Sequence, residues 1–309
     1  MEKKYLVIDV GGTSTKYAVM DEDCNFLEKG KFPSVQEPLE GFVDSIVSLY
    51  RKYEGKVEGI AMSMPGVLDS RTGFMHTGGK IECIHDINMA ELLEKECKVP
   101  VTIENDAKSA ALAEVWRGAL KDCENAVVMV CGTGIGGAVI QNREVVRGKH
   151  NMAGEFSYML MNTQDPFRME NLLGFSGGGP AFIEIAAAKM GIPVKELNGE
   201  MIFDRAEAGD EKALEAIHEY AKILAVQATN YQFILDPERI AVGGGISVRP
   251  LFLEILKEEI AALNHLYDQW DLPAPEVVAC QYFNDSNLIG ALYVHLKARE
   301  RKEQENVSR

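Results

Sequence analysis

The order of apolar and polar positions predicts that the chain begins with two strands joined by a glycine turn. Residues 5–9 (YLVID) are apolar up to a closing aspartate, residues 10–15 (VGGTST) are small or polar, and residues 16–20 (KYAVM) are again mostly apolar. Short apolar runs bounded by glycines are typical of buried strands. A third strand is predicted at 26–33, and apolar residues at helical spacing predict a helix over 38–53.

Strands and helices then alternate. The pattern predicts a strand over 57–66 that enters a Pro-Gly turn, a helix over 89–98, a strand over 99–106 and a helix over 107–119. A group of strands followed by alternating strands and helices predicts a mixed sheet covered by helices.

A second copy of the opening pattern follows. Residues 125–140 (NAVVMVCGTGIGGAVI) align without gaps on residues 5–20 (YLVIDVGGTSTKYAVM), with one glycine turn placed on the other. This indicates an internal duplication of one α/β unit, although any hairpin with a glycine turn would look similar. Further elements are predicted along the rest of the chain: a long helical region over 201–235, a strand over 239–247 that ends in glycines, a helix over 251–264, a strand over 277–282 and a closing helix over 287–299 with a solvated, frayed tail over 300–309.

Composition narrows the class of protein. The chain has 309 residues, with 32 Lys and Arg against 47 Asp and Glu, a net charge of −15. This charge argues against non-specific binding to nucleic acid or to an anionic membrane, whereas backbone N–H groups can still bind an anionic ligand. No apolar run is long enough for a membrane span, and the start does not resemble a signal peptide. The six cysteines are dispersed, which fits a reducing cytoplasm.

Three glycine-rich turns each follow an apolar strand. They comprise Gly11, Gly12 and Thr13; Gly132, Thr133 and Gly134; and Gly243, Gly244 and Gly245. Glycine lets successive N–H groups converge on phosphate oxygens, so three such turns favour a nucleotide site, although tight hairpins also need glycine. The chain lacks a Walker A loop, and its GxGxxG match over 132–137 precedes a strand rather than the helix that a dinucleotide site requires.

Acidic residues stand at the ends of predicted strands. Asp9 precedes the first glycine turn and could hold Mg²⁺ through water, or it could cap the turn. Asp106 could accept the proton of an attacking hydroxyl, or it could cap the following helix, and Asn105 beside it could bind sugar hydroxyls. Glu155 is a third candidate for hydroxyl binding, unless it is an exposed loop acid.

Several motifs together make the chain resemble the ROK family of bacterial sugar kinases and sugar-responsive regulators, within the actin-like ATPase superfamily. The motifs that carry the resemblance are DVGGTSTKYAV, MSMPGVLDSRTG, ENDAKSAALAE, VCGTGIGGAVI, GEFSYM and VGGGIS. The ENDAKSAALAE segment is the most specific of these matches. The resemblance implies an α/β fold of two actin-like, ribonuclease H-like ATPase domains with a central interdomain cleft. We expect the domains at 1–117, closed by a helix at about 287–309, and at 118–286.

The resemblance also implies roles for individual residues. Asp106 is expected to be the general base, and Gly66, Asn105 and Glu155 are expected to bind sugar. The expected ATP-binding residues are Asp9 with Mg²⁺; Gly11, Gly12, Thr13, Lys16, Gly132, Thr133 and Gly134 around the phosphates; and Gly244 and Gly245 near the adenosine. A homodimer is expected from the same resemblance.

Two features depart from the family pattern. Ser157 and Tyr158 stand where the family has Gly-His, and the segment 163–179 contains no cysteine, so the structural zinc of the family is not expected here. Tyr158 is then expected to contact the anomeric end of the sugar, and Glu170 is the nearest candidate for a further sugar-binding glutamate. Loss of the histidine could make room for a substituent on the sugar, as in β-glucoside kinases.

These observations predict a cytoplasmic, ATP-dependent kinase of a hexose-type sugar (glucose, N-acetylmannosamine or a β-glucoside), acting at O6. One alternative is a non-catalytic sugar-binding regulator, and the early position of the first phosphate motif predicts that it would lack a DNA-binding module. Another is a superfamily phosphotransferase or ATPase with a non-sugar acceptor, against which the ENDA segment and Glu155 count.

Overall fold

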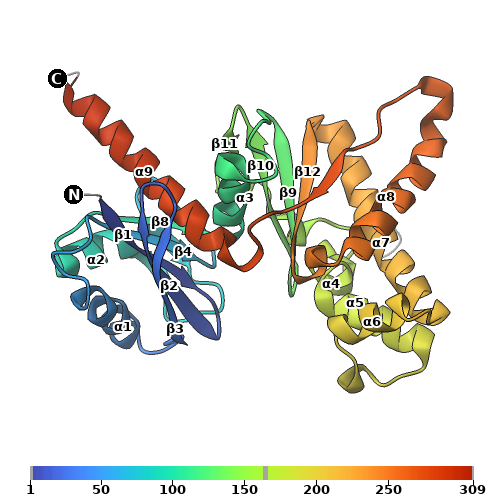
Figure 1. Ribbon diagram of the computed structural model, residues 1–309, viewed down its shortest axis with the longest axis horizontal. Helices are drawn as coiled ribbons and strands as arrows, with labels where there is room; N and C mark the ends of the chain where they lie inside the picture. The colour runs from blue at the N-terminus through green and yellow to red at the C-terminus, as the bar shows by residue number, and fades with distance from the viewer. Residues whose placement is uncertain (1–2, 163–165, 308–309) are drawn as a thin grey trace. The chain divides into compact units, whose positions relative to one another are not determined.

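The computed structural model describes residues 3–162 and 166–307 (Figure 1). The segment 163–165, at the start of the loop expected to lack zinc, and the last two residues of the expected closing helix lie outside the described part. The chain divides into unit 1, comprising Met1–Trp116, Gly148–Met152 and Asn284–Arg309, and unit 2, comprising Arg117–Arg147 and Ala153–Phe283.

A five-stranded sheet forms the centre of unit 1, in the order β3-β2-β1-β4-β8. Its strands are β1 (Lys4–Val10), β2 (Ser14–Asp21), β3 (Phe26–Pro33), β4 (Ile60–Met64) and β8 (Val101–Asn105). β1, β2 and β3 are antiparallel neighbours, while β4 and β8 run parallel to β1. These are the strands that the hydrophobic pattern predicts.

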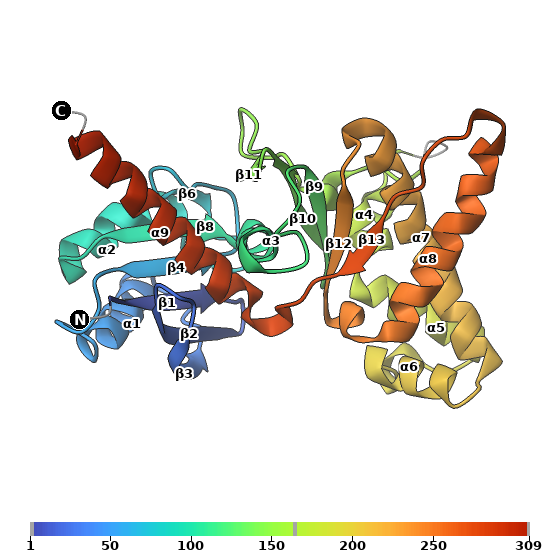
Figure 2. The same ribbon diagram turned by 45° about the horizontal axis from the view of Figure 1, so that its top comes forward.

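Helices cover both faces of this sheet. α1 (Leu39–Arg51) and α2 (Met89–Cys97) supply core residues on one face, and α9 (Ser286–Val307) packs on β1, β4 and β8 (Figure 2). α3 (Asp106–Arg117) crosses α9 closely, because a Cβ atom at Gly290 would lie 1.7 Å from the Ser109 carbonyl oxygen.

The prediction of a frayed tail over 300–309 is wrong for the residues that the structure describes, because α9 continues to Val307. Its last turns are exposed and are stabilised by side-chain ion pairs along the helix. Lys297 lies 2.7 Å from Glu300, and Arg299 lies 3.2 Å from Glu303. A charged helical surface is therefore solvated and still ordered.

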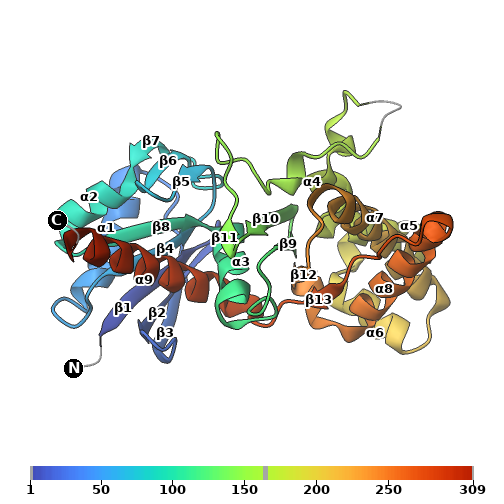
Figure 3. The same ribbon diagram turned by 90° about the horizontal axis from the view of Figure 1, so that it is seen from above.

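A small sheet that the hydrophobic pattern does not predict lies between β4 and α2 in the chain. Its strands are β5 (Leu68–Asp69), β6 (Phe74–Thr77) and β7 (His85–Asn88), and they lie near β8 and α2 (Figure 3). Strands this short show too few alternating positions for a periodicity argument.

Unit 2 contains a second five-stranded sheet, in the order β11-β10-β9-β12-β13. Its strands are β9 (Ala126–Cys131), β10 (Ile135–Gln141), β11 (Glu144–Val145), β12 (Arg239–Gly244) and β13 (Val277–Ala279). An antiparallel hairpin again adjoins two parallel strands, so the predicted duplication is confirmed. The gap-free alignment is wrong at the turn, however. Val10 pairs with Thr15 in the first hairpin and Cys131 pairs with Ile135 in the second, so the second turn is one residue shorter.

Helices pack against this second sheet around a core that includes Phe182, Tyr220 and Phe252. They are α5 (Gly179–Met190), α6 (Gly199–Glu207), α7 (Glu211–Leu235) and α8 (Pro250–Asn264). The single helical region predicted over 201–235 is wrong, because Gly209 takes a positive φ of 94° and Asp210 caps a new helix.

Shorter helical turns complete the structure. They are α4 (Leu173–Ser176), η1 (Phe156–Tyr158), η2 (Met169–Asn171), η3 (Val194–Glu196), η4 (Gly245–Val248), η5 (His265–Trp270) and η6 (Phe283–Asp285). No helix in the described part of the chain combines the length and the apolar character needed to cross a membrane.

Candidate active site

The first glycine turn, in unit 1, joins β1 to β2, and its carbonyl groups accept hydrogen bonds from other residues of the same unit. The Gly11 N–H donates to the Ser14 carbonyl at 3.1 Å, which closes the turn. The segment after β3 donates to all three loop carbonyls: the Ser34 hydroxyl to Gly11 at 2.6 Å, the Gln36 amide to Gly12, and the Ser34 N–H to Thr13 at 3.1 Å.

The N–H groups of the same turn are left for another partner. Within the described residues, neither the Gly12 N–H nor the Thr13 N–H has an acceptor. Since the carbonyl oxygens are occupied and these donors are not, the turn presents N–H groups without competing lone pairs. This arrangement suits a phosphate oxygen.

Asp9 lies at the end of β1, directly before this turn, and is only 6% exposed. Asn287 of α9 donates to its Oδ1 at 3.0 Å, and the Lys16 ammonium lies 3.8 Å from its Oδ2. The lysine is its cross-strand partner in the β1–β2 register, so the pair follows directly from the hairpin. Lys16 also donates to the Asn284 carbonyl at 3.4 Å.

This carboxylate fits an indirect role toward Mg²⁺. One oxygen accepts an amide hydrogen bond and the other faces an ammonium group, so neither is a vacant ligand. Mg²⁺ retains several of its waters in proteins, and a water ligand can bond to a carboxylate placed in this way. The residues present therefore suit the water-mediated contact that the motif implies.

Asn105 and Asp106 stand where β8 ends and α3 begins. The helix cap belongs to Asn105, because its Oδ1 accepts from the Lys108 N–H at 3.1 Å, while Asp106 Oδ1 accepts from the Ala107 N–H at 2.8 Å. Asn105 is only 7% exposed, and its Nδ2 donates to the Gly66 carbonyl at 3.1 Å. The structure thus brings three predicted sugar-side residues together, with Asn105 holding the Gly66 turn to the start of α3.

Gly66 cannot be replaced without displacement of backbone. Its φ is 102°, and a Cβ atom there would lie 2.1 Å from the Thr77 carbonyl oxygen and 2.8 Å from the Gly79 nitrogen. The sugar-side turn therefore rests directly on the loop that follows β6.

The second glycine turn, in unit 2, is held mainly by backbone. The Gly132 N–H donates to the Gly134 carbonyl at 2.9 Å, and the Gly179 N–H donates to the Gly132 carbonyl at 2.8 Å. A Cβ atom at Gly178 would lie 2.2 Å from the Thr133 carbonyl oxygen. The start of α5 therefore lies directly against this turn.

The third glycine-rich segment, residues 243–245, was predicted as a turn, but most of it belongs to a strand. Gly243 and Gly244 belong to β12, and only Gly245 begins the helical turn η4. Gly244 has a φ of 92°, and a Cβ atom there would lie 2.0 Å from the Cys131 carbonyl oxygen. This glycine is required by the close approach of β12 to β9, and it adjoins the residue that precedes the second turn.

The remaining sugar-binding candidates lie at two short helical turns of unit 2, Glu155 and Tyr158 at η1 and Glu170 in η2. Glu155 precedes η1 and is half-buried, whereas Tyr158 is 63% exposed and its side chain makes no hydrogen bond to a described residue. Ser157 turns inward, where its hydroxyl donates to the Ile135 carbonyl at 3.0 Å. Glu170 is exposed and lies 3.6 Å from the Arg168 guanidinium.

Several residues that support these turns were not predicted. Asn287 lies 278 positions from Asp9, and Ser34 and Gln36 contact the first turn from beyond β3. No local pattern marks them. The glycines at 177–179 could have been noticed, because three glycines before an apolar helix form a further glycine-rich turn.

The thiol next to the second turn is chemically inert. Cys131 is 6% exposed, and burial raises the pKa of its thiol to about 12. The Tyr220 hydroxyl nearby donates to the Gly177 carbonyl at 2.6 Å. This cysteine is therefore a small buried side chain rather than a nucleophile.

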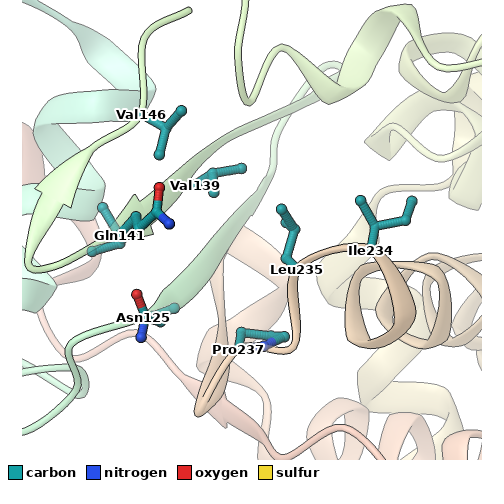
Figure 4. Close-up of a pocket in the computed structure, with 9 residues that line it drawn as sticks. Asn125, Val139, Gln141, Val146, Ile234, Leu235 and Pro237 are labelled. Atoms are coloured by element: carbon teal, nitrogen blue, oxygen red, sulfur yellow. The ribbon is translucent and has the colours of Figure 1, made fainter.

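Unit 2 also has a hollow of about 220 Å³ that contains none of the predicted site residues (Figure 4). It lies between the β9–β10 hairpin and the end of α7. Its lining is Asn125, Ala126, Val139, Ile140, Gln141, Val146, Ile234, Leu235 and Pro237.

Comparison with known proteins decides the family. The sequence model of the ROK family matches residues 5–298. The chain belongs to the ROK family. A β-glucoside kinase of Klebsiella pneumoniae is 32% identical over 297 residues, which cover 94% of this chain and 95% of that protein. A β-glucoside kinase of Listeria monocytogenes is 32% identical over 302 residues, which cover 97% of this chain and all of that protein, 100%.

A solved structure agrees with this assignment. The crystal structure of a ROK family protein from Streptococcus pneumoniae in complex with sucrose matches this ROK protein with a TM-score of 0.84 and 33% identity, over 97% of this chain and 99% of that one. The predicted family and the predicted α/β fold of the actin-like ATPase type are confirmed.

Proposed function

We propose that this ROK protein transfers the γ-phosphoryl group of ATP to O6 of a β-glucoside, with Asp106 as the general base. The chain is a hexose-type sugar kinase, as the sequence predicted, since its relatives across nearly the whole length are sugar kinases. The choice of a β-glucoside rests mainly on one observation, the 32% identity to two β-glucoside kinases over 94% and 97% of this chain.

The proposed reaction conserves atoms and charge in a single transfer. The sugar hydroxyl oxygen attacks the γ-phosphorus, and its proton passes to the Asp106 carboxylate. The bond between the γ-phosphorus and the bridging oxygen of the β-phosphate breaks, and ADP leaves with the electron pair. The start of α3 supports this role, because a helix N-terminus is a favourable place for a negative charge.

Each unit has its own candidate binding groups in this proposal. The N–H groups of Gly12 and Thr13 in unit 1, and those of the second turn in unit 2, would hold phosphate oxygens. Asp9 would hold Mg²⁺ through water, and the bound ion would offset phosphate charge during transfer. Gly244 and Gly245 would lie near the adenosine, and Glu155 and Glu170 near sugar hydroxyls.

Tyr158 supports a substrate larger than a free hexose. It replaces the family histidine, is 63% exposed and has no side-chain hydrogen bond to a described residue. An exposed aromatic ring can stack on a second sugar ring or on another aglycone. Its position therefore fits recognition of the group attached to the anomeric carbon.

The proposal is tested by coupled ADP release with glucose, N-acetylmannosamine and cellobiose, each at the same concentration. We expect the highest kcat/KM with cellobiose and a product phosphorylated at O6 of the non-reducing ring. Turnover of glucose alone would contradict the substrate assignment. Sugar binding without ADP release from any member of the panel would favour the regulator.

Two further expectations accompany this function. ATP-dependent chemistry and six free thiols suit the cytoplasm. Family resemblance also suggests a homodimer with two such sites, which light scattering on the purified protein would measure.

A further inference from the structure

Lys80 lies in unit 1, in the loop between β6 and β7, and the backbone of this loop is well anchored. The Gly78 N–H donates to the Ile84 carbonyl at 2.8 Å, and the Ile81 N–H donates to the Gly78 carbonyl at 3.0 Å. Ile81 and Ile84 are both fully buried. The hydrogen bonds and the buried isoleucine side chains hold the loop on either side of Lys80, so the position of its Cα atom is fixed.

The side chain of Lys80 lies across the first glycine turn. A Cβ atom at Gly12 would lie 2.9 Å from the Lys80 Cδ, 3.3 Å from its Cβ and 3.7 Å from its Cγ. The aliphatic part of the lysine therefore packs on Gly12, in the turn whose Gly12 and Thr13 N–H groups have no acceptor among the described residues.

The same loop also supports the sugar-side turn. Thr77 and Gly79, which precede Lys80, are the residues that a Cβ atom at Gly66 would strike. Asn105, next to the proposed base, donates to the Gly66 carbonyl. Lys80 thus lies where the turn proposed to bind phosphate and the turn proposed to bind sugar come together within one unit.

Lys80 differs from the other lysine of this region in its partners. Lys16 lies 3.8 Å from the Asp9 carboxylate and donates to the Asn284 carbonyl. Lys80 is exposed, and no described carboxylate or carbonyl oxygen lies within bonding distance of its ammonium group. An ammonium group without an anionic partner, on a side chain that packs against a turn with unpaired N–H donors, adds a full positive charge to an anion-binding surface.

We propose that Lys80 is a further catalytic residue, whose ammonium group donates a hydrogen bond to a non-bridging oxygen of the γ-phosphoryl group as it moves from ATP to the sugar. This inference rests on the proposed function. Lys80 retains its proton throughout, and the hydroxyl proton still passes to Asp106. The Lys80 ammonium group stabilises the negative charge that builds up on the transferring group, whereas the first glycine turn provides only N–H groups there.

The experiment compares three variants of the full chain. Lys80→Met retains the aliphatic stem on Gly12 and removes the charge, Lys80→Arg retains the charge, and Lys56→Met removes an exposed, unpaired lysine elsewhere in unit 1. We expect kcat to fall about 10- to 100-fold in Lys80→Met, to recover in part in Lys80→Arg, and to stay unchanged in Lys56→Met. Thermal unfolding of each variant checks that it is folded.

Nucleotide binding gives a second measurement that depends on the γ-phosphate. Lys80→Met should weaken the binding of AMPPNP several-fold and leave the Kd values of ADP and of sugar unchanged. Unchanged kcat in this variant would overturn the inference, as would an equal weakening of ADP binding or any weakening of sugar binding. If the wild-type protein phosphorylates no sugar, the proposed function fails, and the AMPPNP-to-ADP comparison still tests Lys80 by itself.

Discussion

The two glycine turns occupy the same place in two duplicated sheets, but they are built differently. In unit 1, Asp9 and Lys16 face each other across β1 and β2, next to the turn. The cross-strand pair at the same distance from the turn in unit 2 is Val130 and Gly136. The first turn is held by the side chains of Ser34 and Gln36, and the second mainly by the start of α5.

This difference shows how a duplication can keep one backbone frame and change what surrounds the turn. In both turns some N–H groups have no acceptor among the described residues, a property that depends on the hairpin and on glycine. The cross-strand pair next to the turn is charged in unit 1 and uncharged in unit 2. We therefore expect changes near the first turn to act mainly on the transfer step, and changes near the second to act mainly on nucleotide affinity.

Asp106→Asn should have the largest effect and tests whether the transfer step belongs to unit 1. The amide has nearly the same shape but cannot take the sugar proton, so kcat should fall about 10²- to 10⁴-fold. The Kd for sugar should change little. Asp44→Asn, at an exposed position of α1, is the matched control. Near-normal turnover of Asp106→Asn would rule out its role as the base.

Gly178→Ala tests the backbone-built turn of unit 2. The new methyl group would lie 2.2 Å from the Thr133 carbonyl oxygen, which is backbone, so the turn must shift. We expect the KM for ATP to rise about 10-fold with a smaller change in kcat. Gly199→Ala is the control, because nothing lies within 4 Å of a Cβ atom there. A change confined to kcat would contradict the division of tasks.

His295 makes the stability of unit 1 depend on pH. It is 3% exposed on α9, its Nδ1 lies 3.0 Å from the Thr102 hydroxyl, and burial lowers its pKa to about 4, with Arg299 and Lys302 adding to the shift. Below pH 6.5 the unfolded chain binds a proton that the folded chain does not, so stability falls as pH falls toward 4.

Between pH 7 and pH 5 this histidine should account for a loss of about 2 kcal/mol in the free energy of unfolding. Denaturant melts of the wild type and of His295→Gln at both pH values measure it, and the variant should show the weaker dependence on pH. Replacement of the exposed His265 should leave the dependence as it is in the wild type. Parallel curves for His295→Gln and the wild type would contradict the assignment.

Gly12→Ala should have the smallest effect of the series. Its methyl group would lie 2.9 Å from the Lys80 Cδ and 3.3 Å from its Cβ, which are side-chain atoms rather than backbone, so the lysine side chain must shift. We expect kcat to fall about 5-fold, roughly 1 kcal/mol, because the ammonium group is displaced. In a Lys80→Met background the same change should alter kcat less than about 2-fold. Additive effects in the double variant would show that the two residues act independently.

The sequence by itself determined the repeated strand-turn-strand units, most of the helices and the family, and it supplied the candidate site residues. Each of these depends on local patterns: apolar periodicity, glycines after strands, and an ENDA segment at a strand end. The errors came where local signals were weak or ambiguous. Gly209 divides a helical pattern, a charged tail stays helical, and three strands of the β5–β7 sheet are too short to show a period.

Tertiary structure alone decided what surrounds those residues. It showed that Asn105 rather than Asp106 caps α3, that Asn287 bonds to Asp9 across 278 positions, and that Lys80 lies on Gly12. Each of these contacts joins segments distant in the chain, and their meeting depends on how α9 and the small sheet pack on the strands. A local pattern can name a residue type at a strand end, but its partners come from packing, because side chains from separate segments are brought together only when the core forms.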